Sequence, residues 1–584
     1  MKNTKILSGY FDLINILSFT TFAHRVKLLQ IIILSFIGSI FELTSVAVLF
    51  PLLTTFLGSE FDNQPKFLIY FVNLINFYNS DNVALKITLI FSITAILGSL
   101  FRVISLYYSG RITAKIGVYI SDKAYNSALN KPYDFFLKQG TTKLVSTFTT
   151  KPGQVSVSLY SLLIIISSSF LLFSILTTLL LINFQITINT FIALFICYWF
   201  INLLCNKRLK SNSYEMCRNT DLALKSAQQS FDSIREIIID NSQEFFRFDF
   251  NRFTESVRMK YAESSFYGSA PKIIIEPIAV VTIITILILE SNLNNIPLVK
   301  IIPTFGSIIF GLQKILPLMQ LIYANYTALI SNFEFVKDIV SLIDEDVKKD
   351  IIHKPYPFNS QICFKNIYFK YNSSRDNVLE NLNLKILKGQ RIGLIGESGS
   401  GKSTLLDLLV GLLSPTSGEI YADDLLINDK RLIKKYSWKN NISNVSQDVI
   451  LQDISIAENV ALGVPKNEIQ LGLVKKCLEI VQLKSFIKSL PDGIWTLSGE
   501  RGILFSGGQC QRIGIARALY KRKNILILDE ATNRLDLETE SNLIDSIFDN
   551  TDQTIIIVSH RLKSLKKCDD IYELKDKKLN HLMN

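Results

Sequence analysis

The sequence predicts a membrane-spanning bundle of α-helices followed by an α/β domain. The chain has 584 residues, which is too long for one hydrophobic core, so two or more domains are expected. Hydrophobic residues make up 48% of the chain, but they are unevenly spread. Long apolar runs fill residues 26–330, whereas residues 355–584 alternate short apolar runs with charged residues and glycine. The composition changes near residues 335–360, which indicates a boundary there.

These observations divide the chain into four parts. Residues 1–25 lack the apolar core and small-residue cleavage site of a signal peptide, so they are expected to form an amphipathic helix on the inner leaflet. Residues 26–335 are expected to form the transmembrane domain, and residues 336–359 the linker. Residues 360–584 are expected to form the α/β domain.

Six stretches of the transmembrane domain can cross a bilayer, because each holds about twenty mostly apolar residues. The third and fourth are separated only by a short turn near residues 182–185. Buried helices of a large soluble core would account for one or two such runs, but not for six in succession. The stretches are roughly 30–54, 84–107, 158–182, 184–204, 272–290 and 301–327.

The distribution of Lys and Arg predicts how these spans are oriented. Basic residues cluster after the second and fourth spans, whereas residues 58–80 contain only Lys66 and residues 290–298 contain none. Both termini, the two long loops and the α/β domain should therefore face the cytoplasm, from a multi-pass position in the inner (plasma) membrane. The net charge of +11 is then mainly a topology signal and an attraction for anionic lipid headgroups. No nucleic-acid partner is expected, because the basic residues are interleaved with spans.

Two long loops are too polar for the membrane and too long for turns. Residues 109–157 and 205–270 are expected to continue the spans as helices into the cytoplasm, with reversals at 131–140 and 240–250. Both reversals contain Phe clusters that a bare loop would expose, and exposed aromatic patches usually mark docking surfaces. The alternative is that these rings pack within their own loop. The seven cysteines include no CxxC pair, so free thiols are expected rather than a metal or a disulfide.

The stretch RIGLIGESGSGKSTLLDLL (391–409) reads as a short apolar strand, a glycine-rich loop and a helix. It matches the P-loop pattern G-x-x-x-x-G-K-[ST], in which backbone amides at the helix N-terminus face a nucleotide phosphate. Lys402 should reach the β- and γ-phosphates of ATP, and the Ser403 hydroxyl should ligate Mg²⁺. The predicted phosphate-binding residues are Gly396, Glu397, Ser398, Gly399, Ser400, Gly401, Lys402, Ser403 and Thr404.

A second buried strand, in KNILILDEAT (523–532), ends in two carboxylates. Asp529 is expected to hold Mg²⁺ directly or through water, and Glu530 to take a proton from the attacking water. A capped, solvated turn is the alternative, which the P-loop on the same domain makes less favourable.

Three more residues complete the predicted nucleotide site. His560 follows the strand in TIIIVSHRL (554–562), where its ring could hydrogen-bond the γ-phosphate and Glu530. Gln447 follows another short strand and could reach Mg²⁺ and the water. Tyr371 offers a ring for adenine stacking, although an ordinary strand aromatic is the alternative.

The stretch ERGILFSGGQCQR (500–512) is a second candidate anion site. Ser506, Gly507 and Gly508 should leave their backbone amides free, and such amides usually bind an anion. Gln509 completes this turn. A second phosphate site about a hundred residues after the P-loop raises the question of whose phosphate it contacts.

Residues 360–584 resemble the nucleotide-binding domain of ATP-binding cassette (ABC) transporters. The resemblance rests on Tyr371, Walker A (396–404), Gln447, FSGGQ (505–509), Walker B (525–530), a D-loop at 533–536 and His560, in that order. SGERG (498–502) is similar to the segment by which exporters sense their membrane loops. Six spans before one such domain are similar to an ABC exporter half-transporter over essentially the whole chain. The sequence departs from the usual pattern at Phe505, Cys510 and Arg534.

The resemblance implies a composite ATP site. In such domains the SGGQ turn of one copy covers the γ-phosphate bound by Walker A of another. The chain carries one copy of each motif, so a homodimer with two hydrolysing sites is the simplest expectation. ATP would close the two domains on each other and switch the spans from inward- to outward-facing, and hydrolysis would reopen them.

The membrane half says less about the substrate. Glu42 and Glu276 interrupt the first and fifth spans, where a carboxylate is costly unless it is paired or faces water. Arg102 and Lys314 are the candidate partners, and a packing role and a cavity-lining role are equally open. The patterns FELTSVAVLFPLL, FRVISLYYSGR and PKIIIEPIAV are similar to those of bacterial flippases for lipid-linked oligosaccharides. The rival substrates are peptides, drugs and a lipid A-type glycolipid, and an ATP-gated channel is the rival function.

Overall fold

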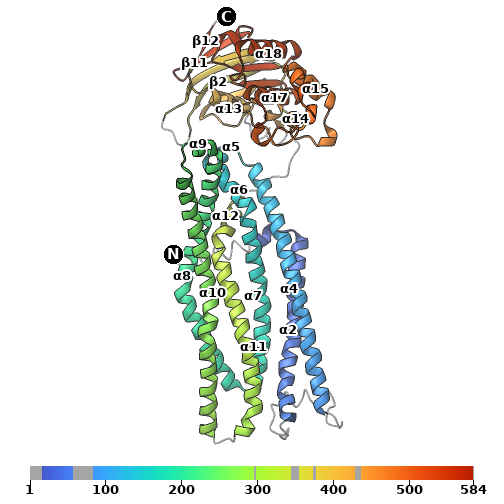
Figure 1. Cartoon of the computed structure of the whole chain (residues 1–584), viewed down its shortest axis with the longest axis vertical. Coiled ribbons are helices and arrows are strands. Elements are labelled where there is room, and N and C mark those ends of the chain that lie inside the picture. Colours follow the sequence, from blue (N-terminus) through green and yellow to red (C-terminus); the bar gives the residue numbers. More distant parts are fainter. Residues whose placement is uncertain are drawn as a thin grey trace. The chain divides into compact units, whose positions relative to one another are not determined.

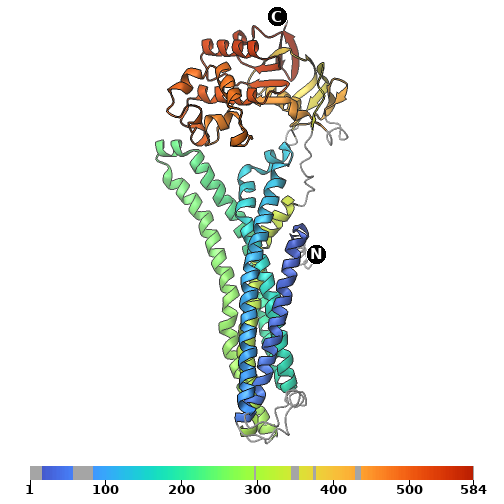
Figure 2. The same ribbon diagram turned by 90° about the vertical axis from the view of Figure 1, so that its right-hand side faces the viewer.

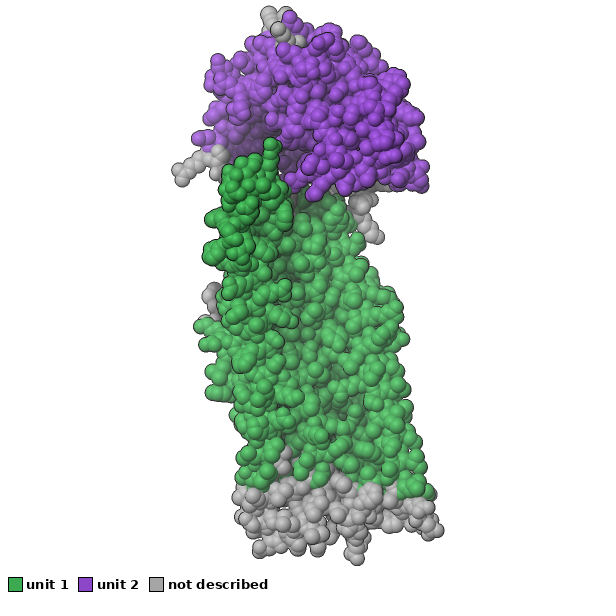
Figure 3. Space-filling view, viewed as in Figure 1, with its two compact units in different colours: residues 1–131, 135–347 green, residues 132–134, 348–584 purple. Residues whose placement is uncertain are grey.

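The structure is a computed structural model that describes residues 16–56, 83–294, 298–343, 354–371, 376–427 and 436–582. The chain divides into two compact units (Figure 3). One is made of residues 1–131 and 135–347, and the other of residues 132–134 and 348–584. The boundary at residue 347 lies inside the stretch 336–359, for which the sequence predicts a linker.

Long helices make up most of the first unit (Figures 1 and 2), and the six predicted spans lie within six of them. In both views α2 runs beside α4, and α8 runs beside α10. Several of these helices extend well past the predicted spans, as the sequence analysis expected for the cytoplasmic extensions. Their bounds are α2 Phe22–Phe56, α4 Val83–Leu129, α7 Lys151–Ile182, α8 Phe184–Asp232, α10 Gln243–Asn294 and α11 Leu298–Ser331.

Within the described residues, four stretches are long and apolar enough to cross a membrane: Phe22–Leu49, Leu85–Leu129, Thr142–Ile182 and Phe184–Asp232. The fifth and sixth predicted spans lie in α10 and α11. The predicted turn between the third and fourth spans is a single residue, Asn183, whose side chain accepts a hydrogen bond from the Ile186 amide at 3.0 Å. This contact caps the start of α8.

The first reversal lies where the sequence predicts it. Two short helices, α5 Tyr133–Gln139 and α6 Thr141–Thr149, connect α4 to α7. The rings of Phe135 and Phe136 are half-buried against a core that includes Leu144 of their own loop and Val336 outside it. They are therefore neither fully exposed nor packed only within their own loop.

The second reversal overlaps only the first residues of the predicted range 240–250 and begins earlier. The chain turns through the short helix α9 (Ile234–Ile239) and the residues after it, and α10 has already begun at Gln243. Residues 243–250 therefore lie in a helix, since nothing in QEFFRFDF breaks one and Glu244 favours a first turn. Phe245 and Phe248 are more than 70% exposed on this helix, as the aromatic cluster led us to expect.

The C-terminal end of the transmembrane domain differs in detail from the prediction. Helix α12 (Phe333–Ile343) occupies the first part of the stretch assigned to the linker, because its apolar residues repeat with a helical period and are buried. The rest of that stretch up to residue 353 lies outside the described residues. Of the predicted N-terminal amphipathic helix, residues 1–15 also lie outside them.

The second unit contains two main sheets. Its six-stranded sheet has the order β12-β11-β4-β10-β9-β8, and β11, β4, β10, β9 and β8 run parallel. Its four-stranded antiparallel sheet has the order β3-β2-β5-β6, and β1 pairs with β7. The first sheet is made of β4 Arg391–Ile395, β8 Ile442–Val445, β9 Ile525–Asp529, β10 Thr554–Val558, β11 Asp570–Lys575 and β12 Lys578–Leu582. The others are β1 Lys354–Pro355, β2 Gln361–Phe369, β3 Leu379–Leu387, β5 Ser417–Ala422, β6 Leu425–Leu426 and β7 Tyr436–Ser437.

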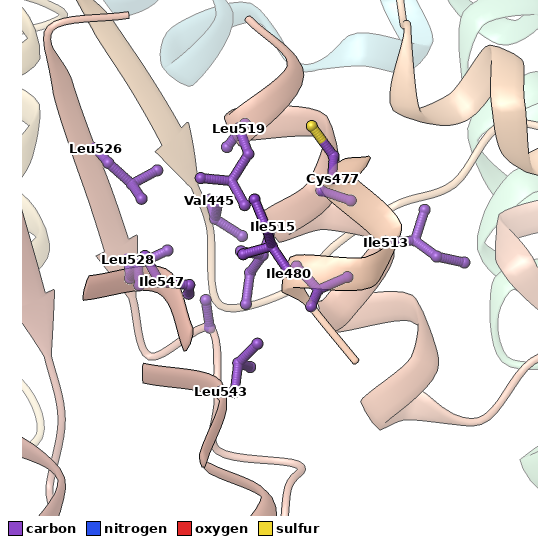
Figure 4. Close-up of a cluster of buried hydrophobic side chains, with 14 of the residues drawn as sticks. Val445, Cys477, Ile480, Ile513, Ile515, Leu519, Leu526, Leu528, Leu543 and Ile547 are labelled. Carbon is purple, nitrogen blue, oxygen red and sulfur yellow. The ribbon is translucent and has the colours of Figure 1, made fainter. Parts of the chain in front are cut away.

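The parallel strands are apolar at successive positions because both faces of the sheet are covered. On β9, Leu526 and Leu528 point into the core cluster of Figure 4, whereas Ile525 and Ile527 point into a second core on the opposite face. Helices α15, α17 and α18 contribute to the first core and α13 to the second. The helix bounds are α13 Lys402–Val410, α14 Ile456–Val460, α15 Leu471–Ile480, α16 Lys484–Ser489, α17 Gly507–Tyr520 and α18 Leu537–Asn550.

Candidate functional site

The sheet of the second unit gathers most of the predicted site residues at one edge. Strands β4, β10, β9 and β8 are neighbours and run parallel, so their carboxyl ends meet at the same edge. The P-loop follows β4, His560 follows β10, Asp529 and Glu530 end β9, and Gln447 follows β8. Residues up to 164 positions apart in the sequence, from Gly396 of the P-loop to His560, are thereby brought together.

The backbone of the P-loop is closely packed against neighbouring backbone groups and against the Lys402 side chain. A Cβ at Gly396 would come within 2.6 Å of the Leu574 carbonyl oxygen, so only glycine fits there. The Lys402 ammonium is buried and donates to the carbonyl oxygens of Gly396 and Glu397 at 2.8 and 2.9 Å. The Ser400 hydroxyl is buried without a hydrogen-bond partner among the described residues. A phosphate oxygen would satisfy this group, so the loop fits a nucleotide phosphate.

Two carboxyl groups lie close to this loop. Burial and the neighbouring charge of Glu530 raise the pKa of Asp529, while Lys402 and a hydrogen bond from Ser403 oppose that rise. Burial and the charge of Asp529 raise the pKa of Asp407 to about 6. The Ser403 hydroxyl and the Asp529 carboxylate are thus neighbouring oxygen donors, which is the ligand type that Mg²⁺ prefers.

The carboxylate of Glu530 is held on both oxygens. His560 Nε2 lies 2.8 Å from Oε1, and Asn533 Nδ2 donates to Oε2 at 2.8 Å. Glu530 also has a positive φ of 51°, which turns the chain sharply after β9 and is uncommon for a residue other than glycine. The contact between His560 and Glu530 is the one that the sequence predicted, whereas the contact with Asn533 was not predicted.

Two further predicted residues lie at the margins of the site. Gln447 is exposed two residues beyond the end of β8. Tyr371 is half-buried two residues beyond the end of β2, and its hydroxyl lies 3.0 Å from the Thr404 hydroxyl in the P-loop helix. Its ring packs edge-on against Phe369 with the centroids 5.0 Å apart. Tyr371 therefore lies next to the P-loop, where its ring can meet a base.

The SGGQ turn starts helix α17, and one detail of the prediction for it was wrong. The Ser506 amide is not free, because it donates to Gln509 Oε1 at 2.9 Å, while the Ser506 hydroxyl accepts from the Gln509 amide. This reciprocal capping box satisfies two of the amides. The amides of Gly507 and Gly508 begin the helix and have no intrahelical acceptor. The anion-binding donors of this turn are thus those of the two glycines.

A buried amide next to this turn was missed by the sequence analysis. The side chain of Asn459, on α14, donates to the Ser498 hydroxyl at 2.8 Å and to the Gln452 carbonyl at 2.9 Å. Its carbonyl oxygen accepts from the Gln452 amide and from Arg517, on helix α17. Asn459 therefore joins the segment after Gln447, the start of SGERG and the SGGQ helix. The residue stands in an ordinary apolar stretch, which gives no signal of this role.

The departure at Arg534 has a structural explanation within the unit. Its guanidinium pairs with Asp448 at 2.8 Å, and its side chain covers Gly507 so closely that a Cβ there would meet it at 2.7 Å. Its backbone amide donates to Gln511. Arg534 thus holds the D-loop against the SGGQ turn and the residue after Gln447.

In the first unit the two carboxylates of the predicted spans behave differently. Glu42, on α2, pairs with Lys314, on α11, which is one of its two predicted partners. Arg102, the other candidate, is exposed. Glu276 is exposed on α10 and forms no ion pair with any residue that the structure describes. The first carboxylate is therefore paired between helices, whereas the second is available to another group.

Two family models match the chain. One, described as ABC transporter, covers residues 379–533, and the other, described as ABC transporter transmembrane region, covers residues 26–309. The first range includes the P-loop, the SGGQ turn and the acidic end of β9, and the second includes most of the long helices.

Similar proteins include two named ATP-dependent lipid A-core flippase. The one from Wigglesworthia glossinidia brevipalpis is 30% identical over 482 residues, covering 80% of each chain. The one from Paraburkholderia xenovorans (strain LB400) is 27% identical over 496 residues, covering 82% of this chain and 80% of the relative. A solved bacterial Atm1-family ABC exporter with ATP bound has the same fold, with a TM-score of 0.75 and 20% identity over 95% of this chain and 94% of that one.

Proposed function

The chain belongs to the ABC transporter family, and on that basis we propose that it is a homodimeric flippase which moves a lipid A-type glycolipid from the cytoplasmic to the outer leaflet of the inner membrane. Binding of ATP and its hydrolysis coupled to transport follow from the family. The observation that carries the substrate proposal is the 27–30% identity, over four fifths of the chain, to relatives named as lipid A-core flippases.

A polar cavity in the first unit supports a substrate with a saccharide or phosphate head. It has a volume of about 540 Å³ and lies among α7, α8, α10, α11 and α12. Arg258 supplies a positive charge, and the Ser331 hydroxyl is buried without a partner among the described residues. Sugar hydroxyls and phosphates need such partners when they leave water. The other polar residues of the wall are Thr150, Gln154, Thr220, Tyr261, Ser264, Ser265, Ser269, Thr327 and Asn332.

A lipid-linked oligosaccharide is the second candidate substrate. It shares with a lipid A-type glycolipid a sugar head, a phosphate and an apolar tail, so the same cavity would suit it. The patterns around Glu42 and Glu276 that are similar to those of oligosaccharide flippases favour it, whereas the names of the relatives favour the first candidate. Peptides, drugs and an ATP-gated channel remain as outcomes of the experiment below.

The proposed ATP chemistry uses the residues gathered at the sheet edge. Lys402 and the P-loop amides bind the phosphates, the Gly507 and Gly508 amides of another copy cover the γ-phosphate, and Tyr371 stacks on the adenine. Ser403, Asp529 and Gln447 would hold Mg²⁺, which supplies charge neutralisation at the transferring phosphoryl group. Glu530 takes the proton of the attacking water, and His560 and Asn533 orient its carboxylate.

The proposed homodimer follows from an ATP site that takes its P-loop from one chain and its SGGQ turn from the other. Each chain carries one P-loop and one SGGQ turn, and the resemblance to ABC exporters implies that the two belong to different sites. ATP would bind the closed pair more tightly than the open pair, and this difference would drive the change of the spans. Both termini and the ATP-binding domain would then face the cytoplasm.

Purified protein in liposomes tests the substrate. ATP turnover is measured against added lipid A-type glycolipid, lipid-linked oligosaccharide, peptides and dyes, together with the appearance of each lipid in the opposite leaflet. We expect the lipid A-type glycolipid to stimulate turnover and to be translocated only with ATP. Stimulation by the oligosaccharide alone would favour the second candidate. Stimulation by neither lipid, or an ATP-gated ion current, would overturn the proposal.

A charge variant links the cavity to the substrate. In Arg258→Gln the glycolipid concentration for half-maximal stimulation should rise about tenfold, because one charge-assisted hydrogen bond is lost. Arg252→Gln is the matched control, since Arg252 is exposed on the same helix and lies outside the cavity wall. Equal effects of the two variants would contradict the assignment of this cavity as the substrate-binding site.

A further inference from the structure

A second cavity of the first unit lies between α2 and α4 and takes no part in the proposed transport or hydrolysis. Its volume is about 380 Å³. Three positively charged side chains line it, and its lining contains no acidic residue. The charged residues are Lys27, Arg111 and Lys115, and the apolar ones include Ile31, Leu34 and Ile104.

Charged and apolar residues are separated along the length of this cavity. On α2, Lys27 is followed by Ile31 and Leu34, which lie on the same helix face because they are spaced by four and three residues. On α4, Arg111 is preceded by Tyr108 and Ile104 on one face in the same way. The helices are antiparallel, so the charged ends of the two stripes coincide and so do the apolar ends.

Close packing of the two helices ends the cavity on its apolar side. The hydroxyls of Ser35, on α2, and Ser105, on α4, lie 2.6 Å apart and are buried. One turn further, a Cβ at Gly38 would come within 3.1 Å of the Phe101 Cβ. The cavity therefore ends where the two helices come together, on the side away from the charged residues.

The three charges are not neutralised by the described part of the protein. None of Lys27, Arg111 and Lys115 forms an ion pair with a carboxylate in the described ranges, and all three are exposed. Within the described ranges, the Arg111 guanidinium hydrogen-bonds a neutral partner, the Tyr107 hydroxyl at 3.3 Å. Because the lining holds three cations and no acidic residue, the cavity carries a net positive charge. Lys314 and Lys151 of the same unit, in contrast, pair with carboxylates.

The cavity crosses the predicted membrane boundary. The first predicted span begins near residue 30 and the second ends near residue 107, so Ile31, Leu34 and Ile104 fall within the hydrocarbon. The three charges fall just outside it, on the side that the Lys and Arg distribution assigns to the cytoplasm. A soluble phosphate would gain nothing from the apolar half, whereas a lipid can use both halves.

We propose that this cavity, the α2–α4 lipid site, binds the phosphate headgroup of an anionic phospholipid of the cytoplasmic leaflet. Lys27, Arg111 and Lys115 contact the phosphate, and an acyl chain lies against Ile31, Leu34 and Ile104. The site rests on the proposed orientation of the chain and not on the proposed substrate. Each cation near an anionic lipid surface contributes about 1 kcal/mol, so three correspond to roughly a hundredfold in affinity.

Native mass spectrometry of the delipidated full-length protein tests the site without ATP or transport substrate. Phosphatidylglycerol, phosphatidylcholine and inorganic phosphate are titrated separately, and the first lipid bound per chain is counted. We expect phosphatidylglycerol to bind at least tenfold more tightly than phosphatidylcholine, and inorganic phosphate not to displace it. The triple variant Lys27→Gln, Arg111→Gln, Lys115→Gln should lose this preference.

Two further variants make the result specific. The triple variant Lys207→Gln, Arg218→Gln, Lys225→Gln removes three exposed charges from α8 and should keep the preference. The variant Lys27→Arg, Arg111→Lys, Lys115→Arg keeps the three positive charges and should also retain the preference for phosphatidylglycerol. This variant distinguishes the loss of charge from an effect of substitution on folding. Equal affinity for the two lipids, or equal losses in the two Gln triples, would overturn the site. Displacement of the lipid by inorganic phosphate would also overturn it. Because ATP is absent, none of these outcomes depends on the proposed flippase activity.

Discussion

His560 Nε2 lies 2.8 Å from Glu530 Oε1, and this contact joins the ends of two adjacent parallel strands. Asn533 occupies the other carboxylate oxygen at 2.8 Å, so the carboxylate is fixed in one orientation. A group that accepts a proton from water must be held in this way while the phosphoryl group is transferred. The relationship therefore supports Glu530 as the proposed base and His560 and Asn533 as its positioning residues.

The first prediction concerns this base. Glu530→Gln keeps the shape of the side chain but removes its ability to take a proton, so ATP turnover should fall at least about a hundredfold. ATP affinity should be retained, because the P-loop is untouched. Turnover and equilibrium nucleotide binding are measured on the purified full-length protein, with Glu538→Gln on the first turn of α18 as the matched control. Hydrolysis at the normal rate in Glu530→Gln would refute the assignment.

The predictions that succeeded rest on short local patterns. The P-loop and the paired carboxylates after β9 could be located from the sequence because a buried strand, a glycine loop and a helix each have a local signature. The contact of His560 with Glu530 could be predicted because each residue follows a buried strand that ends at the nucleotide cleft. The helical spans followed from length and hydrophobicity alone.

The features that were missed depend on tertiary contacts. Asn459 and Lys151 carry no signature of their own, because their roles depend on partners distant in the sequence, such as Ser498 for Asn459 and Asp338 for Lys151. The predicted range 240–250 extends past the reversal, because the Phe cluster near residue 245 favours a loop in the sequence but lies on an exposed helix in the structure. The Ser506 amide was expected to be free because the reciprocal contact with Gln509 could be recognised only once the helix start was known.

A buried charge cluster gives the second prediction. The side chain of Lys151 is fully buried, and its ammonium pairs with Asp338 at 2.7 Å and Asp221 at 3.1 Å. These contacts tie α7 to α12 and α8. Lys151→Met should lower the free energy of unfolding by about 3–5 kcal/mol, because two carboxylates lose their common partner.

Thermal unfolding of the full-length protein in detergent measures this effect. The variant Lys151→Met, Asp221→Asn, Asp338→Asn removes the charges together and should recover much of the loss. An unchanged unfolding temperature for Lys151→Met alone would contradict the role of the cluster. Lys337→Met, which removes an exposed lysine on α12, is the control.

The third prediction concerns Asn459. Its side chain is fully buried and satisfies polar groups of Gln452, Ser498 and Arg517. Asn459→Ala should lower the stability of the ATP-binding domain by about 2–4 kcal/mol, since several buried polar groups lose their partner at once. The domain's unfolding transition is followed in the full-length chain by calorimetry. Asn444→Ala, at an exposed position of β8, should change the stability of this domain by less than about 0.5 kcal/mol. Equal effects of the two variants would contradict the stabilising role of the Asn459 hydrogen bonds.

The cysteines of the second unit give a prediction on reactivity and pH. Burial raises the pKa of Cys477 to about 11 and the pKa of Cys568 to about 12. Both thiols therefore stay protonated at pH 8, and the reactive thiolate form is rare. Of the four cysteines of this unit, half-buried Cys363 should react first with a maleimide, and Cys477 and Cys568 only after denaturation. Peptide mapping by mass spectrometry identifies the labelled sites, and rapid native labelling of Cys568 at pH 8 would contradict the structure.

The last prediction tests whether each ATP site is shared between two copies. Lys402→Ala removes the P-loop ammonium, and Ser506→Arg removes the cap of the SGGQ turn and fills the space before the glycine amides. Homodimers of either variant should lose hydrolysis at both sites. In a mixed pair, one site combines both defects, whereas the other combines the intact P-loop of one chain with the intact SGGQ turn of the other. Co-expression with two different tags and sequential purification isolates this mixed pair, which should regain ATP turnover from its one intact site. A site completed within a single chain would leave the mixed pair as inactive as its parents, because every chain would then carry a defect in its own site.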